Sequence, residues 1–306
     1  MSIQFRLFGK FSVQRDTQSV RRLDSSKEQE LLSYLLVRRD RPHTRETLAS
    51  LLWGDSSTEK SKKYLRQALW HLQAGLETDG LAGQHVLLVE HDWVQLNLQS
   101  EVWLDVAQFE QAFAATQGVS GKQLDKPGAA MLKDAVRLYT GDLLDGCYQE
   151  WCLFERERLQ NMYLSMLDKL MGYCEQHQHF EAGQGYGSTI LRYDRASERT
   201  YRRLMHLQYM AGDRTGALRQ YERCVAALRE ELGVKPERRT RAVYEYIRAD
   251  EPERVRPSDD SAALPAATLP EVLGRLKRLH LVLNAVQKRV QRDIKAVEQG
   301  LKTLKL

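Results

Sequence analysis

The segment from Ser56 to Leu76 is rich in cationic side chains that could bind phosphate groups. Four leucines follow one another at intervals of four, three and four residues, which predicts an α-helix with one apolar face. Ser56 and Glu59 fit a capping box at the start of this helix. The four leucines are Leu65, Leu69, Leu72 and Leu76.

The remaining surface of this predicted helix could contact DNA. A helix in the major groove needs cations for the phosphates and polar side chains that reach the base edges. We expect Arg66 and Gln67 to read bases, and Lys60 and Lys63 to meet phosphates. A solvated charged face is the alternative interpretation, because runs of charge usually serve solvation. The residues expected on the DNA side are Lys60, Lys62, Lys63, Arg66, Gln67 and Trp70, with His71 just beyond them.

The neighbouring segments predict a small domain around this helix. Residues 3–13 alternate in polarity, as expected of a hairpin with one buried face. Leucine spacing predicts one helix over 25–37 and a second over 44–54, the latter capped by the threonine at its start. Residues 86–98 form two strands around a polar turn at His91.

Strands, three helices and a hairpin in this order make a winged helix, in which the third helix enters the major groove. The segment resembles the OmpR-type winged helix in RLFGKFSV, SSKEQELLSYLL, RPHTRETLASLLWG and KYLRQALWHLQAGL, with LWG the most specific match. In such a domain Thr44 and Arg45 approach the DNA backbone, and His91 lies at the tip of the wing. Trp70 and His71 replace the shorter polar side chains usual in the family, so no base preference is carried over.

The following segment resembles a bacterial transcriptional activation domain, the helical partner of the winged helix in SARP-type regulators. The matching phrases are VWLDVAQFEQAF, LYTGDLLDG, WCLFERERLQNMYLSML, ERTYRRLMHLQYMAGDRTGALRQYERCVAALREELGVKP and AVYEYI. A two-helix unit that recurs in residues 153–227 with a period of about 40 predicts tetratricopeptide-like packing. The resemblance implies tandem repeats in the target DNA, contact with RNA polymerase, and a helical domain that braces the winged helix.

Three glycines fall within residues 182–188, where relatives carry a regular helix. Each glycine inside a helix costs about 1 kcal/mol relative to alanine. Gly183, Gly185 and Gly187 therefore predict a bend or a close approach of the backbone to a neighbour. The GxGxG pattern follows no strand, which argues against a dinucleotide-binding loop.

The C-terminal part predicts a linker and an amphipathic coiled-coil helix. Residues 249–270 are rich in proline, alanine, serine and acidic residues and have no periodicity. Apolar residues of 271–306 recur at intervals of three and four, with a stutter where two fours adjoin, and predict a homodimer. A helix that folds back on the central domain is the alternative. The seam consists of Leu276, Leu279, Leu283, Val286, Val290, Ile294, Val297 and Leu301.

Composition limits the remaining classes of function. The 306 residues carry a net charge of +5, and no apolar run approaches the ~20 residues that span a bilayer. Because no signal peptide is recognisable, we expect a cytoplasmic protein without membrane contact. The four cysteines lack CxxC spacing and are expected to be reduced and buried. Cys174, His177 and His179 lack a fourth ligand, so no metal site and no cofactor are expected.

These patterns predict a mainly α fold. It has an N-terminal winged helix with small β-sheets over 1–100, an α-helical tetratricopeptide-like repeat domain over 101–248, a linker over 249–270 and a C-terminal coiled-coil helix over 271–306. We expect a transcription activator that binds double-stranded promoter DNA. No nucleophile elbow, phosphate loop, paired-carboxylate motif or metal-spaced cluster indicates an enzyme. The alternative is an adaptor whose repeat domain senses a ligand or a protein, and a small-molecule effector at the repeat surface fits either reading.

Overall fold

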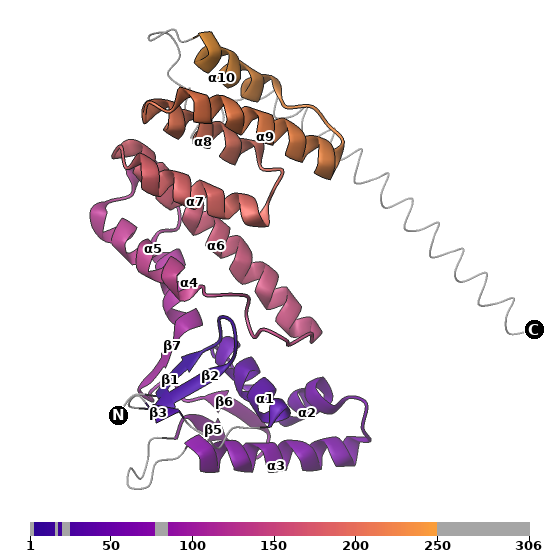
Figure 1. Ribbon diagram of the computed structural model, residues 1–306. Helices are drawn as coiled ribbons and strands as arrows, with labels where there is room; N and C mark the ends of the chain where they lie inside the picture. The colour runs from indigo at the N-terminus through magenta and orange to yellow at the C-terminus, as the bar shows by residue number, and fades with distance from the viewer. Residues whose placement is uncertain (1–2, 16–17, 20–24, 77–84, 250–306) are drawn as a thin grey trace, which may run out of the picture. The chain divides into compact units, whose positions relative to one another are not determined.

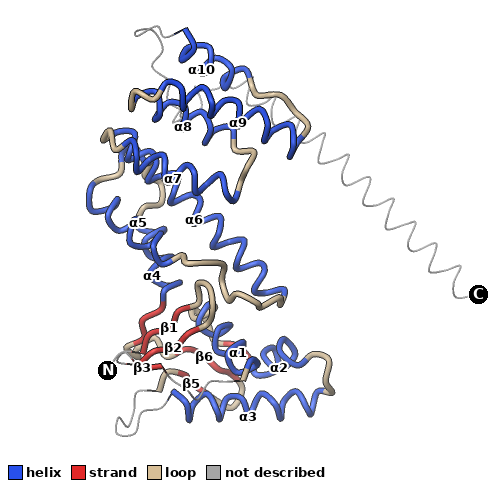
Figure 2. Tube along the Cα trace, viewed as in Figure 1, coloured by secondary structure: helices blue, strands red, loops and turns tan. Residues whose placement is uncertain are grey.

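The computed structural model describes residues 3–15, 18–19, 25–76 and 85–249. The chain divides into two compact units, Met1–Glu251 and Pro252–Leu306, and every described residue belongs to the first. This unit is mainly helical, with small sheets near its N-terminus, as predicted (Figures 1 and 2). The predicted coiled-coil helix with its eight seam residues lies outside the described residues, as does the predicted linker beyond residue 249.

A four-stranded sheet opens the fold, with the strand order β3-β2-β1-β7. The antiparallel pairing of β1 with β2 confirms the hairpin that the alternating residues predict. Strand β7 follows the wing in the sequence and pairs parallel to β1. Sequence analysis missed this strand. The strands are β1 (Ile3–Arg6), β2 (Ser12–Arg15), β3 (Gln18–Ser19) and β7 (Val102–Leu104).

Three helices and a second sheet follow the leading strands and complete a winged helix. The second sheet has the order β4-β6-β5, and all its pairings are antiparallel. The hairpin of β5 and β6 is the predicted wing, to which a short strand before α2 adds a third member. The elements are α1 (Ser26–Val37), β4 (His43–Thr44), α2 (Arg45–Trp53), α3 (Thr58–Leu76), β5 (Leu87–Val89) and β6 (Trp93–Leu96).

The junction of α2 and α3 corrects one detail of the sequence analysis. The capping box predicted from Ser56 and Glu59 is wrong, because α3 begins two residues later, at Thr58. Ser56 lies in the intervening turn, where its N–H donates to the carbonyl oxygen of Trp53 at 3.0 Å. The buried hydroxyl of Ser61 donates to the same oxygen at 2.8 Å and so ties the end of α2 to the first turn of α3.

Helical pairs form the rest of the described chain. The predicted two-helix units appear as α6 packed on α7 and α8 packed on α9, while α4 and α5 form an earlier pair and α10 packs against α8 and α9 (Figure 1). The elements are α4 (Asp105–Ala115), a 3-10 turn η1 (Gly121–Gln123), α5 (Lys126–Leu138), α6 (Glu150–Gln176), α7 (Phe180–Tyr193), α8 (Glu198–Met210), α9 (Arg214–Leu232) and α10 (Arg238–Ala249).

The glycines of α7 explain how closely this helix approaches α8. A Cβ atom on Gly187 would lie 2.7 Å from Cδ2 of Leu204, and one on Gly183 would lie 3.0 Å from Cδ1 of Leu207. Gly185 faces open space. The predicted close approach is therefore correct at two of the three positions, and α7 continues as one helix through all three glycines.

A buried carboxylate joins the first sheet to the helical region. Asp105, at the start of α4, accepts hydrogen bonds from the N–H groups of Leu7 (2.8 Å) and Phe8 (3.0 Å). Burial raises the pKa of Asp105, and these backbone donors oppose that rise. The carboxylate thus satisfies two amides where the chain leaves β1.

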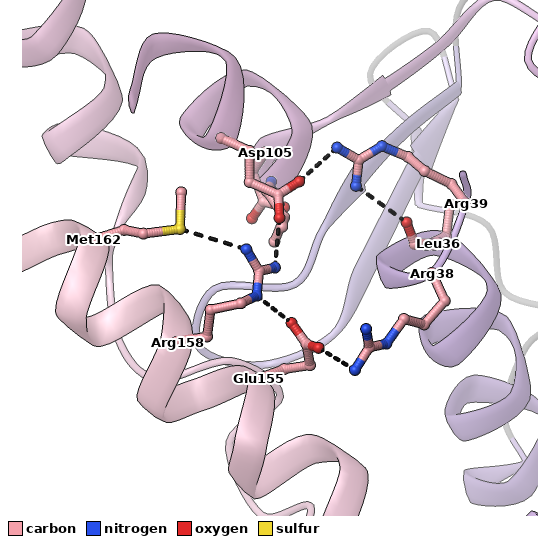
Figure 3. A network of polar contacts seen from close by, with 9 residues as sticks. Leu36, Arg38, Arg39, Asp105, Glu155, Arg158 and Met162 are labelled. Carbon is pink, nitrogen blue, oxygen red and sulfur yellow. Dashed lines mark hydrogen bonds and ion pairs between the residues drawn. The ribbon is translucent and has the colours of Figure 1, made fainter. Parts of the chain in front are cut away.

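A ladder of alternating charges connects the end of α1 with α4 and α6. Glu155, only 2% exposed, pairs with Arg38 at 2.5 Å and with Nε of Arg158 at 2.7 Å. Glu110 on α4 pairs with Arg39 and with the other end of the Arg158 guanidinium, both at 2.5 Å. Figure 3 shows Glu155 between Arg38 and Arg158. The winged helix is therefore held to the helical pairs by paired charges as well as by apolar contacts.

The glycine contacts predict opposite effects for two neighbouring substitutions. Gly187→Ala should lower the free energy of unfolding by roughly 1–2 kcal/mol, because its methyl group overlaps Leu204. Gly185→Ala, the matched control in the same helix, should raise it by about 0.5–1 kcal/mol through helix propensity. Urea unfolding followed by circular dichroism measures both, and a stabilised Gly187→Ala protein would contradict the packing.

The charge ladder predicts a cost for removing its buried charge. Glu155→Gln should lower the free energy of unfolding by about 1–3 kcal/mol, because a neutral amide leaves Arg38 and Arg158 without a carboxylate between them. Glu157→Gln, an exposed glutamate on the same helix, should change it by less than about 0.5 kcal/mol. Equal effects of both substitutions in the same urea titrations would argue against the ladder.

Candidate nucleic-acid interface

The inward face of α3 attaches this helix to the core of the winged helix. Leu65, Leu69, Leu72 and Leu76 are all buried, as their spacing predicts. They join the core cluster that includes Leu31 and other leucines of α1. Because one side of α3 is committed to the core, the opposite side must face outward.

The outward face of α3 carries all six of its predicted DNA contacts. Trp70 is 66% exposed, which is unusual for so large an apolar side chain. Residues 63, 67, 70 and 74 recur at intervals of four, three and four, and residue 66 lies beside them, so they form one exposed stripe along the helix. The six predicted residues, all exposed, are Lys60, Lys62, Lys63, Arg66, Gln67 and Trp70.

The cations on the outward face of α3 have no acidic partners among the described residues. Within residues 3–15, 18–19, 25–76 and 85–249, no carboxylate forms an ion pair with Lys60, Lys62, Lys63 or Arg66. The arginines at the end of α1 and in α6 differ, since Arg38 and Arg158 are each bound to Glu155. The charge of α3 therefore remains available for an anionic partner such as a phosphate backbone.

Tyr64 adds an aromatic side chain to this surface that sequence analysis missed. It is 41% exposed, and its ring lies 6.4 Å from the ring of Trp53 on α2. Its position could have been inferred from helical spacing, because Tyr64 follows Lys60 by four residues and precedes Gln67 by three. Tyr64 is thus a further candidate for contact with DNA.

His71 does not belong to the outward face. Its Nδ1 atom lies 2.6 Å from Oε1 of Glu28, which is buried on α1. We expected His71 to lie next to the DNA-side residues, and the structure corrects this. One residue along a helix is a turn of about 100°, so the His71 side chain points toward α1 although Trp70 points outward. His71 instead helps to orient α3 against α1.

The structure brings the other three predicted contacts together at the wing. Thr44 pairs with Trp93 across strands β4 and β6. The N–H of Arg45 donates to the carbonyl oxygen of Asp92 at 3.0 Å, and His91 is the neighbouring residue in the wing turn. The start of α2 and the tip of the wing therefore form one surface.

The wing tip itself is not cationic. The His91 side chain is 96% exposed, and its Nδ1 atom lies 2.6 Å from a carboxylate oxygen of Asp92. Glu90 adds a second acidic residue on the other side of His91. The cations of this candidate surface therefore lie mainly on α3 and not at the tip of the wing.

The described residues hold neither a cluster suited to a metal ion nor a helix that could cross a membrane. In this part of the chain, no three histidine, cysteine, aspartate or glutamate side chains are grouped closely enough to hold a metal ion. The rings of His177 and His179 instead lie against Tyr173, at 4.3 and 6.1 Å. Among the helices described, none has the length and apolar character needed to cross a membrane.

Comparisons with known proteins agree with this architecture. Residues 104–248 match the family model of the bacterial transcriptional activator domain. The structure of Mycobacterium tuberculosis EmbR in complex with a low affinity phosphopeptide is similar in fold, with a TM-score of 0.62 and 19% sequence identity. The match covers 82% of this chain and 66% of the EmbR chain. No curated protein sequence matches the chain.

Proposed function

We propose that this chain, which carries a bacterial transcriptional activator domain over residues 104–248 behind a winged helix, is a transcriptional activator of the SARP family that binds promoter DNA sequence-specifically through α3. One observation carries this proposal. The cations of α3 are exposed and have no carboxylate partner in the described part of the chain, while the opposite face of the helix is buried.

The exposed side chains divide by chemistry into two roles. Lys60, Lys62 and Lys63 lie in the first two turns of α3 and contact phosphates, because an ammonium group binds as a point charge. Arg66 and Gln67 follow on the same stripe and contact base edges, since a guanidinium or an amide can form two parallel hydrogen bonds to one base. The exposed residues that complete the interface are Trp70 on α3, Thr44 at the start of α2 and His91 at the wing, together with the half-buried Arg45.

The remaining segments present this winged helix at a promoter. The helical domain over 101–248 braces the winged helix, and the Glu155 ladder supports that role. Activation then proceeds by binding to tandem promoter repeats and by contact with RNA polymerase in the cytoplasm. These steps rest on resemblance to the family and not on a described contact.

The C-terminal segment makes the protein a homodimer. The apolar seam of 271–306 requires a partner helix, which a second copy supplies. A coiled-coil dimer is two-fold symmetric, whereas tandem DNA repeats run head to tail. We propose that the 249–270 linker reconciles these two symmetries.

The adaptor reading makes a different prediction for the same interface. If the repeat domain alone carries the function, selection of random duplex DNA with the full chain yields no enriched sequence. A spaced tandem motif in that selection supports the activator instead. The selected duplex then serves as the probe for the substitutions below.

Substitutions on α3 should separate base reading from phosphate binding. Arg66→Ala should weaken binding to the selected duplex by about 1–3 kcal/mol and relax the preference at one base pair. Lys63→Ala should weaken binding to all sequences alike and lower the slope of log K against log salt by about one. Fluorescence anisotropy at several salt concentrations measures both effects.

The control is Arg137→Ala, which removes an exposed arginine of α5 outside the interface. It should leave DNA affinity unchanged. Loss of affinity in Arg137→Ala, or unchanged affinity in both α3 variants, would remove the support for this interface. Circular dichroism melts of the three variants should match the parent protein, because all three positions are exposed.

The dimer proposal predicts the mass of the full chain in solution. Light scattering at micromolar concentration should give twice the chain mass of 35.4 kDa. The seam substitutions Leu283→Asp and Val290→Asp together should give a monomer, because buried carboxylates are costly in a coiled-coil seam. Gln287→Asp, outside the seam, should remain dimeric, and a monomeric parent protein would refute the proposal.

A further inference from the structure

Trp70 places a large apolar surface on the outward face of α3. Its side chain is 66% exposed. It follows Arg66 by four residues and Gln67 by three, so the indole lies next to the two side chains that are proposed to contact base edges. An exposed aromatic surface gains free energy when a partner covers it. Trp70 is therefore suited to an apolar group of the partner, whereas its two neighbours are suited to polar groups.

A fixed neighbour supports the indole of Trp70. The centre of the indole lies 5.2 Å from the centre of the His71 imidazole, and the two ring planes are inclined at 58°. Nδ1 of His71 lies in turn 2.6 Å from Oε1 of Glu28, which is buried on α1. The indole thus lies against a side chain that is itself anchored to α1. Because this contact restricts the indole before binding, less conformational entropy is lost when DNA covers it.

The base edges in the major groove of DNA offer one apolar group, the 5-methyl group of thymine. Cytosine carries only a hydrogen at the corresponding carbon. The indole has one N–H donor and no acceptor, and the rest of its surface is apolar. It cannot form the two parallel hydrogen bonds to one base that are available to Arg66 and Gln67. The thymine methyl is therefore the group in the major groove that Trp70 matches best.

We propose that Trp70 reads a thymine through its 5-methyl group. This inference rests on the proposed function, because it requires α3 to lie in the major groove, and it adds a base identity that the family resemblance leaves open. Residues four apart are separated by about 6 Å along a helix, which corresponds to roughly two base-pair steps when the helix lies along the groove. The thymine should therefore lie within about two base pairs of the base that Arg66 reads.

The test uses the full chain and the duplex obtained by selection. Each thymine of that duplex is replaced in turn by uracil, which lacks only the methyl group, and binding is measured by fluorescence anisotropy. At one position, uracil should weaken binding of the parent protein about three- to fivefold, as expected for one buried methyl group. In Trp70→Ala the same replacement should change affinity by less than about twofold, which is within ordinary additivity. Effects of uracil on the duplex itself cancel, because both proteins bind the same two duplexes.

A second set of duplexes separates the methyl group from the rest of the base. At the same position, a C·G pair should bind the parent protein more weakly than T·A, and 5-methylcytosine should recover about threefold in affinity. Trp70→Ala should not respond to the added methyl group. Trp70→Phe should respond nearly as the parent protein does, because phenylalanine keeps an aromatic surface at this position. A purely structural role of Trp70 would weaken binding to all these duplexes alike.

The matched control is Phe154→Ala. Phe154 is an aromatic residue of α6 that is 62% exposed and lies outside the proposed DNA interface. This variant should keep the affinity of the parent protein and the full uracil effect. Circular dichroism melts of the substituted proteins should match the parent protein, because both positions are exposed.

Two results would overturn this inference and leave the proposed function intact. One is a selected motif without a thymine within about two base pairs of the position that Arg66→Ala relaxes. The other is a uracil penalty that is absent from the parent protein or equally large in Trp70→Ala. If selection enriches no sequence at all, the proposed function fails, and this inference fails with it.

Discussion

A carboxylate that is buried must be paired, and Glu155 has partners on either side of the junction between the winged helix and the helical domain. Arg38 reaches it from the end of α1, and Arg158 reaches it from one turn further along α6. Arg158 also binds Glu110, so three helices share one chain of charges. Separation of the winged helix from the helical domain would leave the Glu155 carboxylate with Arg158 as its partner but without Arg38. The two domains are therefore associated through this ion pair as well as through apolar contacts.

This arrangement fixes the position of α3. The helix is attached to α1 through its leucines and through the contact between His71 and Glu28, and α1 in turn ends at the charge ladder. Its outward cations take no part in these attachments. Binding of an anionic partner therefore competes with no intramolecular ion pair in the described part of the chain, and the cost of breaking such pairs does not reduce affinity.

Close backbone packing has a separate physical origin in the helical domain. Gly183 and Gly187 let α7 approach α8 to a distance that side chains would prevent, and their helix-propensity cost is offset by contact with Leu204 and Leu207. The same pair of helices thus shows why three glycines in one helix need not interrupt it. Only Gly185, which faces open space, has no packing explanation.

The sequence by itself determined the leading hairpin, the three helices and the wing of the first domain, the buried leucine face of α3 and the cationic face opposite it, because periodicity in one segment encodes both faces of a helix. Only the tertiary structure decided which residues meet across long separations. Glu155 with Arg38, His71 with Glu28 and β7 beside β1 are contacts between distant segments, and no local pattern marks them. The exposed cations could be read from spacing, whereas their freedom from acidic partners depends on where every described carboxylate lies in the fold.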